Sequence, residues 1–202
     1  MGALNTFGYI LASGRGCADV GMVSVRFGSN YYSGQIITRT DSGITSIADL
    51  AGKTFCRPDP LSTSGWIIPS ITMQANGIDP ANDLAEIVDA GGHDAVVTAV
   101  VNGDCDAGAT FVDARPEDAM DVTTVIAESA PIPNDTISFA PDMSPELRAE
   151  VIGALLTISS GDNASVLSDT YNWDSLEEAS DAFFDDFRQQ LDAAGLNIEE
   201  LN

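Results

Sequence analysis

The chain has 202 residues, enough for one or two compact domains, and 44% of them are apolar, which can fill a core. Its formal net charge is −23, from 31 acidic and 8 basic residues, which argues against nucleic acid and anionic lipid as partners because both require clustered Lys and Arg. No run of about 18 apolar residues occurs and no basic region follows Met1, so we expect neither a transmembrane helix nor a secretory signal in this chain.

The first 52 residues predict two helices and two strands. Residues 3–14 carry apolar side chains at helical spacing and stop at Gly14, whereas residues 19–27 and 32–40 are rich in β-branched residues and predict strands. Ser46 ends a turn and can cap a short helix that Gly52 terminates.

A regular alternation of strands and helices follows. We predict strands at residues 53–58, 85–91, 106–111 and 122–129, and helices at residues 65–77, 93–103 and 112–120. Pro69 lies inside the first of these helices and predicts a kink. The alternation is typical of βαβ units on a parallel sheet.

The C-terminal third is predicted to be mostly helical. A strand at residues 136–140 is followed by Ser144, an N-cap before a proline, and by Ser175–Glu178, which has the S-x-x-E pattern of a capping box. Apolar residues then recur at spacings of three and four up to Ala194. We therefore expect a final amphipathic helix that begins near residue 175.

Two breaks in the pattern, at residues 38–43 and 130–135, bracket an α/β unit of about 90 residues, within the usual size of a domain. We predict one domain from residues 1–41 with 133–202 and a second from residues 42–132. The outer domain has few strands for its helices. The expectation is therefore an α/β fold of two lobes whose first lobe is incomplete at the N-terminus.

The cysteines and the single histidine bear on metal binding. Cys17, Cys56 and Cys105 form no C-x-x-C pair, so we expect no zinc site and no other metal or cofactor. The odd number leaves at least one thiol free or paired with another chain. Because Cys56 and Cys105 flank strands predicted to be adjacent, a disulfide between them is one hypothesis.

The stretch "DPLSTSGW" places three hydroxyl side chains, Ser62, Thr63 and Ser64, before a glycine and a helix. Hydroxyls and the free N–H groups at a helix start donate hydrogen bonds, so together they can hold an anion without Lys or Arg. Ser62 could instead be only an N-cap. His93 opens the helix after another strand, where it is either a ligand or simply a polar helix start.

Two acidic residues and a tyrosine complete the candidates. Asp113 follows the strand at residues 106–111, and Asp135 lies at the second break between the lobes. Ligands bind beyond the carboxyl ends of strands in open parallel sheets, which favours a binding site there. The alternative is that both carboxylates are ordinary solvated side chains and that Tyr32 only fills a strand.

The segments "YYSGQIITRTDSGITSIADLAGKTF", "DPLSTSGWIIP", "GGHDAVVTAVVNGDCDAGAT" and "PIPNDTISF" resemble the phosphate/phosphite/phosphonate-binding proteins of ABC transporters. The similarity covers nearly the whole chain and is densest from Tyr31 to Asp135. It implies the two-lobed fold of periplasmic binding proteins, with ligand held in the cleft between the lobes. The family's export signal and first strand–helix portion are not seen in this chain.

By motif, the resemblance assigns the phosphonate oxygens to Tyr32, the hydroxyls of Ser62, Thr63 and Ser64, and His93. It assigns the amine of aminoalkylphosphonates to acidic residues at Asp113 and Asp135.

The resemblance also implies a periplasmic or other extracytoplasmic monomer, lipid-anchored in its full-length form or not, that delivers its ligand to an ABC permease and catalyses nothing. Two alternatives stay open: a hydrolase that uses Ser62 or Ser64 with His93 and an acid such as Asp106, and an enzyme or sensor with the binding-protein fold. Against the hydrolase, no G-x-S-x-G elbow is present.

Overall fold

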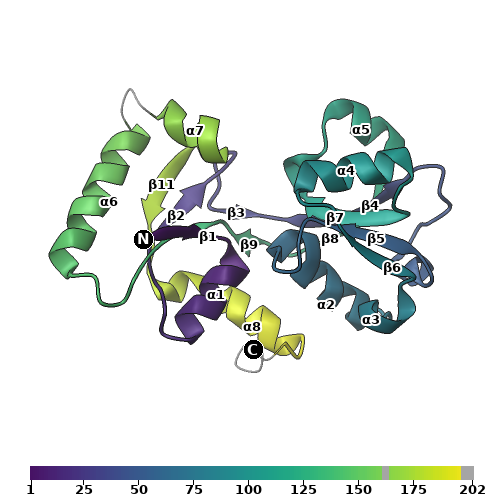
Figure 1. The fold of residues 1–202 in the computed structure, drawn as a ribbon, viewed down its shortest axis with the longest axis horizontal. Helices are drawn as coiled ribbons and strands as arrows, with labels where there is room; N and C mark the ends of the chain where they lie inside the picture. Colours follow the sequence, from purple (N-terminus) through teal and green to yellow (C-terminus); the bar gives the residue numbers. More distant parts are fainter. Residues whose placement is uncertain (161–163, 197–202) are drawn as a thin grey trace. The chain divides into compact units, whose positions relative to one another are not determined.

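The computed structural model describes residues 1–160 and 164–196 and divides the chain into two compact units (Figure 1). Unit 1 comprises Met1–Tyr32 and the segment from Pro133 onward, and unit 2 comprises Ser33–Ile132. The first crossing thus precedes Ser33 rather than following residue 41 as predicted. The cause is strand β4 (Gly34–Arg39), which pairs on both sides with strands of unit 2 and therefore belongs to that unit's sheet.

Unit 1 contains a four-stranded sheet in the order β1-β10-β2-β11, in which every neighbouring pair is antiparallel. Its strands are β1 (Gly2–Leu4), β2 (Asp19–Val25), β10 (Thr136–Phe139) and β11 (Ser175–Glu178). Its helices are α1 (Thr6–Gly14), α6 (Pro145–Ser160), α7 (Ser165–Tyr171) and α8 (Asp185–Ala193). Two-residue strands, β3 (Tyr31–Tyr32) and β9 (Ile132–Pro133), lie at the crossings.

The start of the first helix shows how local sequence sets an element. Asn5 is the N-cap of α1, and its side chain accepts a hydrogen bond from the Gly8 amide at 2.7 Å. The residues before this cap form β1, a strand that the sequence did not predict. Three residues are too few to show the alternation of a strand, and the partner strand β10 lies more than 130 residues later in the sequence.

The capping box predicted at Ser175–Glu178 is wrong, because this tetrapeptide is strand β11. It pairs with β2, with Ser175 opposite Val25, and it places Leu176 in a core beside Met22. A strand buries alternate residues. Pairing with β2, about 150 residues earlier in the sequence, makes this segment a strand rather than a helix start. The final helix starts later, at Asp185, and buries Phe187 and Leu191 as the apolar spacing predicted.

Unit 2 contains a five-stranded sheet in the order β6-β5-β7-β4-β8. Besides β4, its strands are β5 (Thr54–Arg57), β6 (Glu86–Asp89), β7 (Ala107–Phe111) and β8 (Thr123–Glu128). Its α-helices are α2 (Ile68–Ala75), α3 (Pro80–Asp83), α4 (His93–Asn102) and α5 (Glu117–Val122).

The expected parallel sheet is confirmed only in part of unit 2. Strands β5, β6 and β7 are mutually parallel, whereas β4 runs antiparallel to β7 and to β8. The register pairs Gln35, near the start of β4, with Glu128 at the end of β8. The chain therefore enters and leaves unit 2 at the same end of its sheet, which requires β4 and β8 to run in opposite directions.

The two faces of this sheet alternate residue by residue along its strands. Ile36 and Phe55 pack with Met73 of α2 in one core, while the next residues, Ile37 and Cys56, pack with the valines of α4 in the other. Figure 1 shows α2 and α4 on opposite sides of the sheet. The sheet of unit 2 is thus covered on both faces, as in other α/β domains.

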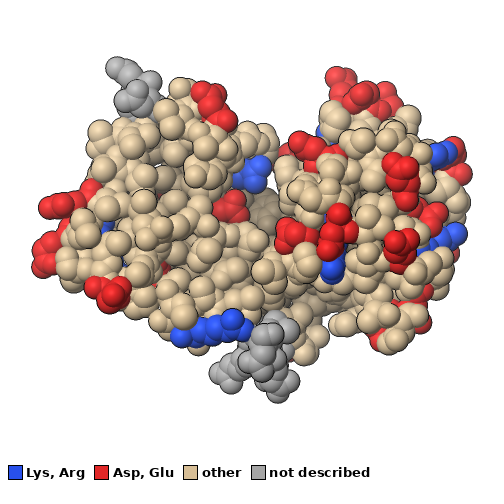
Figure 2. Space-filling model, viewed as in Figure 1, with Lys and Arg blue, Asp and Glu red and all other residues tan. Residues whose placement is uncertain are grey.

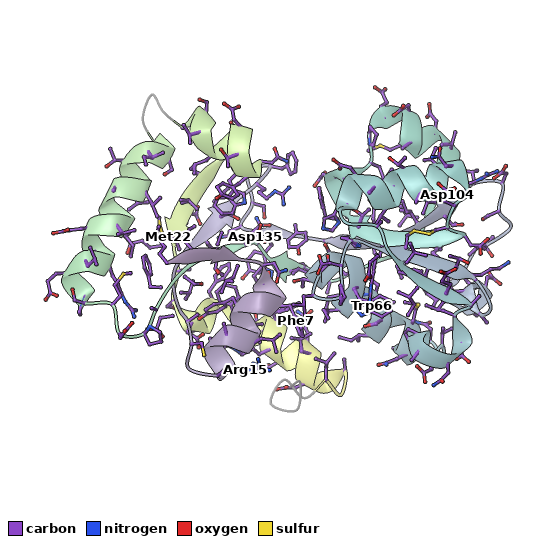
Figure 3. All side chains as sticks on the ribbon, in the orientation of Figure 1. Phe7, Arg15, Met22, Trp66, Asp104 and Asp135 are labelled. Atoms are coloured by element: carbon purple, nitrogen blue, oxygen red, sulfur yellow. A yellow bond between two sulfur atoms is a disulfide. The ribbon has the colours of Figure 1, made fainter. Side chains whose placement is uncertain are left out.

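The hypothesis of a disulfide between Cys56 and Cys105 is confirmed. The two cysteines are bonded, with their Cα atoms 5.9 Å apart, and the bond is visible in unit 2 in Figure 3. The bond joins Cys56 in β5 to Cys105, which lies just before the start of β7. Cys17 of unit 1 is an exposed free thiol.

The acidic surface is evident in both units, where Asp and Glu side chains outnumber Lys and Arg on the visible face (Figure 2). Ion pairs join Arg39 to Asp41, Arg57 to Asp89, Arg148 to Asp19, and Arg188 to both Asp181 and Asp185. Eight basic residues can pair with only a minority of 31 acids, so self-repulsion is built into this surface. Among the described residues, no helix has the length and apolarity needed to cross a membrane.

Candidate functional site

The candidate residues of unit 2 lie at one edge of its sheet. The hydroxyl stretch Ser62–Ser64 follows β5, His93 follows β6, and Asp113 follows β7. Because these three strands are parallel, their carboxyl ends meet at the same edge. It is also the edge at which the chain enters and leaves the unit, since Phe111 at the end of β7 pairs with Gly34 at the start of β4.

The hydroxyl stretch begins a helix of mixed geometry. Ser62 is its N-cap: the Ser62 hydroxyl accepts from the Gly65 amide at 3.2 Å, and the Ser62 carbonyl accepts from the amides of Trp66 and Ile67 at 2.9 and 3.0 Å. The chain makes a π-helical turn over Thr63–Ile67 before α2 begins. Pro69 thus lies in the first turn of α2, where its missing N–H costs least, rather than in the middle of one longer helix as predicted.

All three hydroxyl side chains are buried, with Ser62 5% exposed and Thr63 and Ser64 2% exposed. The Ser64 hydroxyl makes no hydrogen bond within the described residues, and Ser64 is one of the residues that line an open pocket with Gly34, Thr72 and Ser129. Ser62 accepts a hydrogen bond as the N-cap, which leaves its O–H able to donate, so its part in ligand binding stays a prediction. Ser64 keeps its hydrogen-bonding capacity for a ligand or water.

Two glycines allow the backbone to approach this turn. A Cβ atom at Gly65 would lie 2.2 Å from Cδ of Pro58 and 2.8 Å from the Ser62 hydroxyl. A Cβ atom at Gly34 would lie 3.0 Å from Cβ of Ser64. Glycine at both positions brings the hydroxyl stretch against the end of β5 and the start of β4.

His93 is the first residue of α4 and is half-buried. Its Nδ1 lies 2.9 Å from Oγ1 of Thr110, a fully buried residue of β7, and its ring meets the Phe111 ring edge-on with centroids 4.9 Å apart. The sequence did not single out Thr110. The available signal was its place near the end of β7, where alternation turns it to one face of the sheet.

The sequence also missed a cation at this edge. The Arg57 guanidinium lies 4.3 Å from the centre of the Trp66 ring, and its Nε is 2.5 Å from Oδ1 of Asp89 (Figure 3 labels Trp66). Arg57 ends β5 and Asp89 ends β6, so the pair follows from their register. The Asp89 carboxylate compensates the charge of this arginine.

The other acidic candidates have different surroundings. Asp113 of unit 2 is exposed. Asp135 of unit 1 is half-buried: burial raises the pKa of its carboxyl, while the charge of Arg26 and a hydrogen bond with Trp173 act in the opposite direction. Asp135 and Tyr32 belong to unit 1, and their part in a site with Ser62–Ser64 stays a prediction.

Comparison with known proteins gives a consistent picture. A family model described as "ABC transporter, phosphonate, periplasmic substrate-binding protein" matches residues 1–184. The phosphate-import protein PhnD of Mycolicibacterium smegmatis is 34% identical over 115 residues, which cover 52% of this chain and 36% of that protein. The chain therefore spans about a third of that curated relative's length.

Two solved structures share the fold. A binding protein component of an ABC phosphonate transporter from Pseudomonas aeruginosa has a TM-score of 0.81 at 21% identity, covering 95% of this chain and 67% of that one. PhnD1 from Prochlorococcus marinus, in complex with methylphosphonate, has a TM-score of 0.76 at 13% identity, covering 96% and 78%. These likenesses confirm the expected α/β fold of the periplasmic binding proteins.

Proposed function

Since this chain belongs to the family of periplasmic substrate-binding proteins of phosphonate ABC transporters, we propose that it binds a phosphonate or a related phosphorus oxyanion, such as phosphite or phosphate. It then delivers this ligand to an ABC permease in the membrane. The observation that carries the proposal is the edge of unit 2, where buried hydroxyls at a helix start and a fixed imidazole follow the carboxyl ends of parallel strands.

The physical basis is a set of directed donors. The helical segment that begins at Thr63 places the positive end of its dipole at the hydroxyl stretch, which favours an anion. The hydroxyls of Thr63 and Ser64 and the imidazole of His93, which follow the carboxyl ends of neighbouring strands, would add donors. A tetrahedral oxyanion has several acceptor oxygens and matches such a set.

The ligand we favour also carries an ammonium group. Asp113 lies at the same edge as the hydroxyl stretch, and an exposed carboxylate there repels a bare dianion. An ammonium two carbons from the phosphorus would give this carboxylate a partner. We therefore propose 2-aminoethylphosphonate as a better ligand than methylphosphonate, with Asp135 as a second amine partner.

The geometry weighs against the hydrolase alternative. Neither Ser62 nor Ser64 hydrogen-bonds with His93 in the described residues, and His93 Nδ1 faces Thr110 rather than a carboxylate. Asp106 precedes β7 and its carboxylate accepts from the amide of Thr54 at the start of β5. It therefore lies at the amino ends of the strands, about 13 Å from the His93 edge. We propose a binding protein rather than an enzyme.

The disulfide supports a place outside the cytoplasm. The Cys56–Cys105 bond lies in the core of unit 2, with both residues no more than 2% exposed. Disulfides of this kind form and persist in oxidising compartments such as the periplasm and the bacterial exterior. We therefore propose an extracytoplasmic protein, and, from the family resemblance, a monomer.

Titration calorimetry with 2-aminoethylphosphonate, methylphosphonate, phosphite and phosphate tests this function, with sulfate and acetate as control anions. We expect heat of binding for at least one phosphorus compound and none for acetate. An ester-hydrolysis assay on the same sample should show no turnover. Turnover that is lost in a Ser64→Ala variant, or the absence of binding to every phosphorus compound, would overturn the proposal.

A further inference from the structure

We propose that Thr110 is a positioning residue for the anion site: its buried hydroxyl holds His93 as the neutral tautomer that carries its hydrogen on Nε2. The inference rests on the proposed function for the role of His93, and on geometry alone for the tautomer. It adds to the site a residue that contributes through the imidazole rather than by touching the ligand.

Thr110 is placed by the register of the sheet. It lies next to the last residue of β7, opposite Gln35 of β4, and it is 0% exposed. Its Oγ1 is 2.9 Å from Nδ1 of His93. The neighbouring Phe111 holds the ring from another side, with centroids 4.9 Å apart. The imidazole is thus fixed by two successive residues of one strand.

The direction of the hydrogen bond follows from the hydroxyl. Within the described residues, the Thr110 hydroxyl has no partner other than His93 Nδ1. If Nδ1 carried the hydrogen and donated it, the buried O–H of Thr110 would point at no acceptor. Leaving a buried donor unpaired disfavours a state by roughly 5- to 150-fold. The hydroxyl therefore donates, Nδ1 accepts, and the hydrogen of the neutral ring is on Nε2.

This arrangement decides what the imidazole offers a ligand. A ring nitrogen without hydrogen presents a lone pair, which repels an oxyanion, whereas Nε2–H donates to it. Thr110 thereby converts His93 from a group with two possible roles into a fixed donor. The site then holds its anion through uncharged donors, in keeping with the hydroxyl stretch beside it and with the pairing of Arg57 to Asp89.

The chain offers an unambiguous probe, because His93 is its single histidine. Long-range proton–nitrogen correlation spectra of uniformly 15N-labelled protein without ligand, recorded above the pH at which the ring is charged, distinguish the two neutral tautomers by their cross-peak patterns. We expect the Nε2–H pattern in the parent. A parent that shows the Nδ1–H pattern would overturn the proposal without any variant being needed.

Three variants separate positioning from structure. Thr110→Val keeps the shape and removes the hydroxyl; we expect a mixture of tautomers and about fivefold weaker binding of 2-aminoethylphosphonate or methylphosphonate. Thr110→Ser restores the donor and should restore both readouts. Thr38→Val is the matched control, since Thr38 is an equally buried hydroxyl of the same sheet that bonds to Ser42 and the Asp106 carbonyl instead. It should leave the tautomer and the affinity unchanged.

The outcomes are distinguishable. An unchanged tautomer in Thr110→Val, or a changed tautomer in Thr38→Val, would overturn the assignment of the hydrogen bond. A changed tautomer with full phosphonate affinity would overturn the positioning role. A parent with the Nε2–H tautomer that binds no phosphorus compound would support the tautomer assignment and refute the proposed function.

Discussion

Among the glycines of unit 2, replacing Gly65 by alanine should disturb the hydroxyl stretch most. The new Cβ atom would lie 2.2 and 2.6 Å from two ring carbons of Pro58 and 2.8 Å from the Ser62 hydroxyl. Ordinary van der Waals contact begins at 3.4 Å, so the proline or the π-helical turn must move by about 1.2 Å. Gly65 is not at a positive φ, so the effect is steric.

The magnitude has two parts. Overpacking a buried position costs about 1–3 kcal/mol of stability, and the same shift moves the donors of the turn. A displacement of about 1 Å breaks a hydrogen bond of ordinary length, and each bond to a charged ligand contributes about 1.5–3 kcal/mol. We therefore expect Gly65→Ala to lower the free energy of unfolding of unit 2 by about 1–3 kcal/mol and to weaken phosphonate binding at least about tenfold.

The assay follows each unit by its own tryptophan. The chain has two tryptophans, Trp66 in unit 2 and Trp173 in unit 1, so urea unfolding monitored by fluorescence in a Trp173→Phe background reports unit 2. Gly153→Ala in α6 of unit 1 is the control, because a Cβ atom at Gly153 meets nothing within 4 Å; its unfolding is followed by Trp173 in a Trp66→Phe background. Replacing glycine by alanine inside a helix should raise the free energy of unfolding by about 0.5–1 kcal/mol. The same substitution should therefore stabilise at Gly153 and destabilise at Gly65.

Parental stability and parental affinity in Gly65→Ala would refute the reasoning, since they would show that the turn accommodates a methyl group without moving its hydroxyls. Loss of stability with full affinity would refute the link between the position of the turn and ligand binding.

Four further predictions follow. Raising the salt concentration from about 0.01 to 1 M, which shortens the Debye length from about 30 to 3 Å, should raise the melting temperature because the net charge is −23; a flat or falling curve would remove the self-repulsion argument. Thr63→Val should weaken phosphonate binding roughly 10- to 150-fold in calorimetry, and parental affinity would show that its hydroxyl is not a ligand. Asp113→Asn should narrow the preference for 2-aminoethylphosphonate over methylphosphonate; an unchanged ratio of affinities would exclude Asp113 as the amine partner. Burial and a hydrogen bond to Asp181 raise the pKa of Tyr9 to about 12, so unfolding curves should show stability lost as the pH rises from about 10 to 12, and a loss that persists in Tyr9→Phe would contradict this cause.

Much of unit 2 could be predicted because its signals are local. Turn residues bound strands β5, β6 and β7, and the helix that starts at His93 ends at Asn102, before Gly103, whose left-handed backbone suits glycine. The disulfide could be predicted because Cys56 lies in one strand and Cys105 lies just before another, and the two strands were expected to be neighbours. The shared edge of the candidates in unit 2 followed from parallel strand ends.

The predictions that were wrong or missing concern segments whose structural partners lie far away in the sequence. Ser175–Glu178 satisfies a helix-capping pattern and a strand pattern equally, and only pairing with β2 selects the strand. The direction of β4 and its membership of unit 2 likewise come from β7 and β8, which no residue within β4 specifies. Thr110 was missed for a similar reason: a buried threonine in a strand has no distinctive sequence pattern until His93 is placed beside it.

The order of strands in unit 1 has a consequence for how the chain folds. β10, which lies between β1 and β2, is synthesised only after the whole of unit 2. At about 5–20 residues per second, the roughly 100 residues of unit 2 take about 5–20 s to synthesise, so β10 follows β2 only after that interval. During this interval β1 and β2 have no central strand to pair with, and the apolar side chains of β2, such as Met22, are uncovered. Because the sheet of unit 1 forms only through contacts of high sequence separation, we expect unit 1 to be the slower-folding unit and the one more exposed to misassembly.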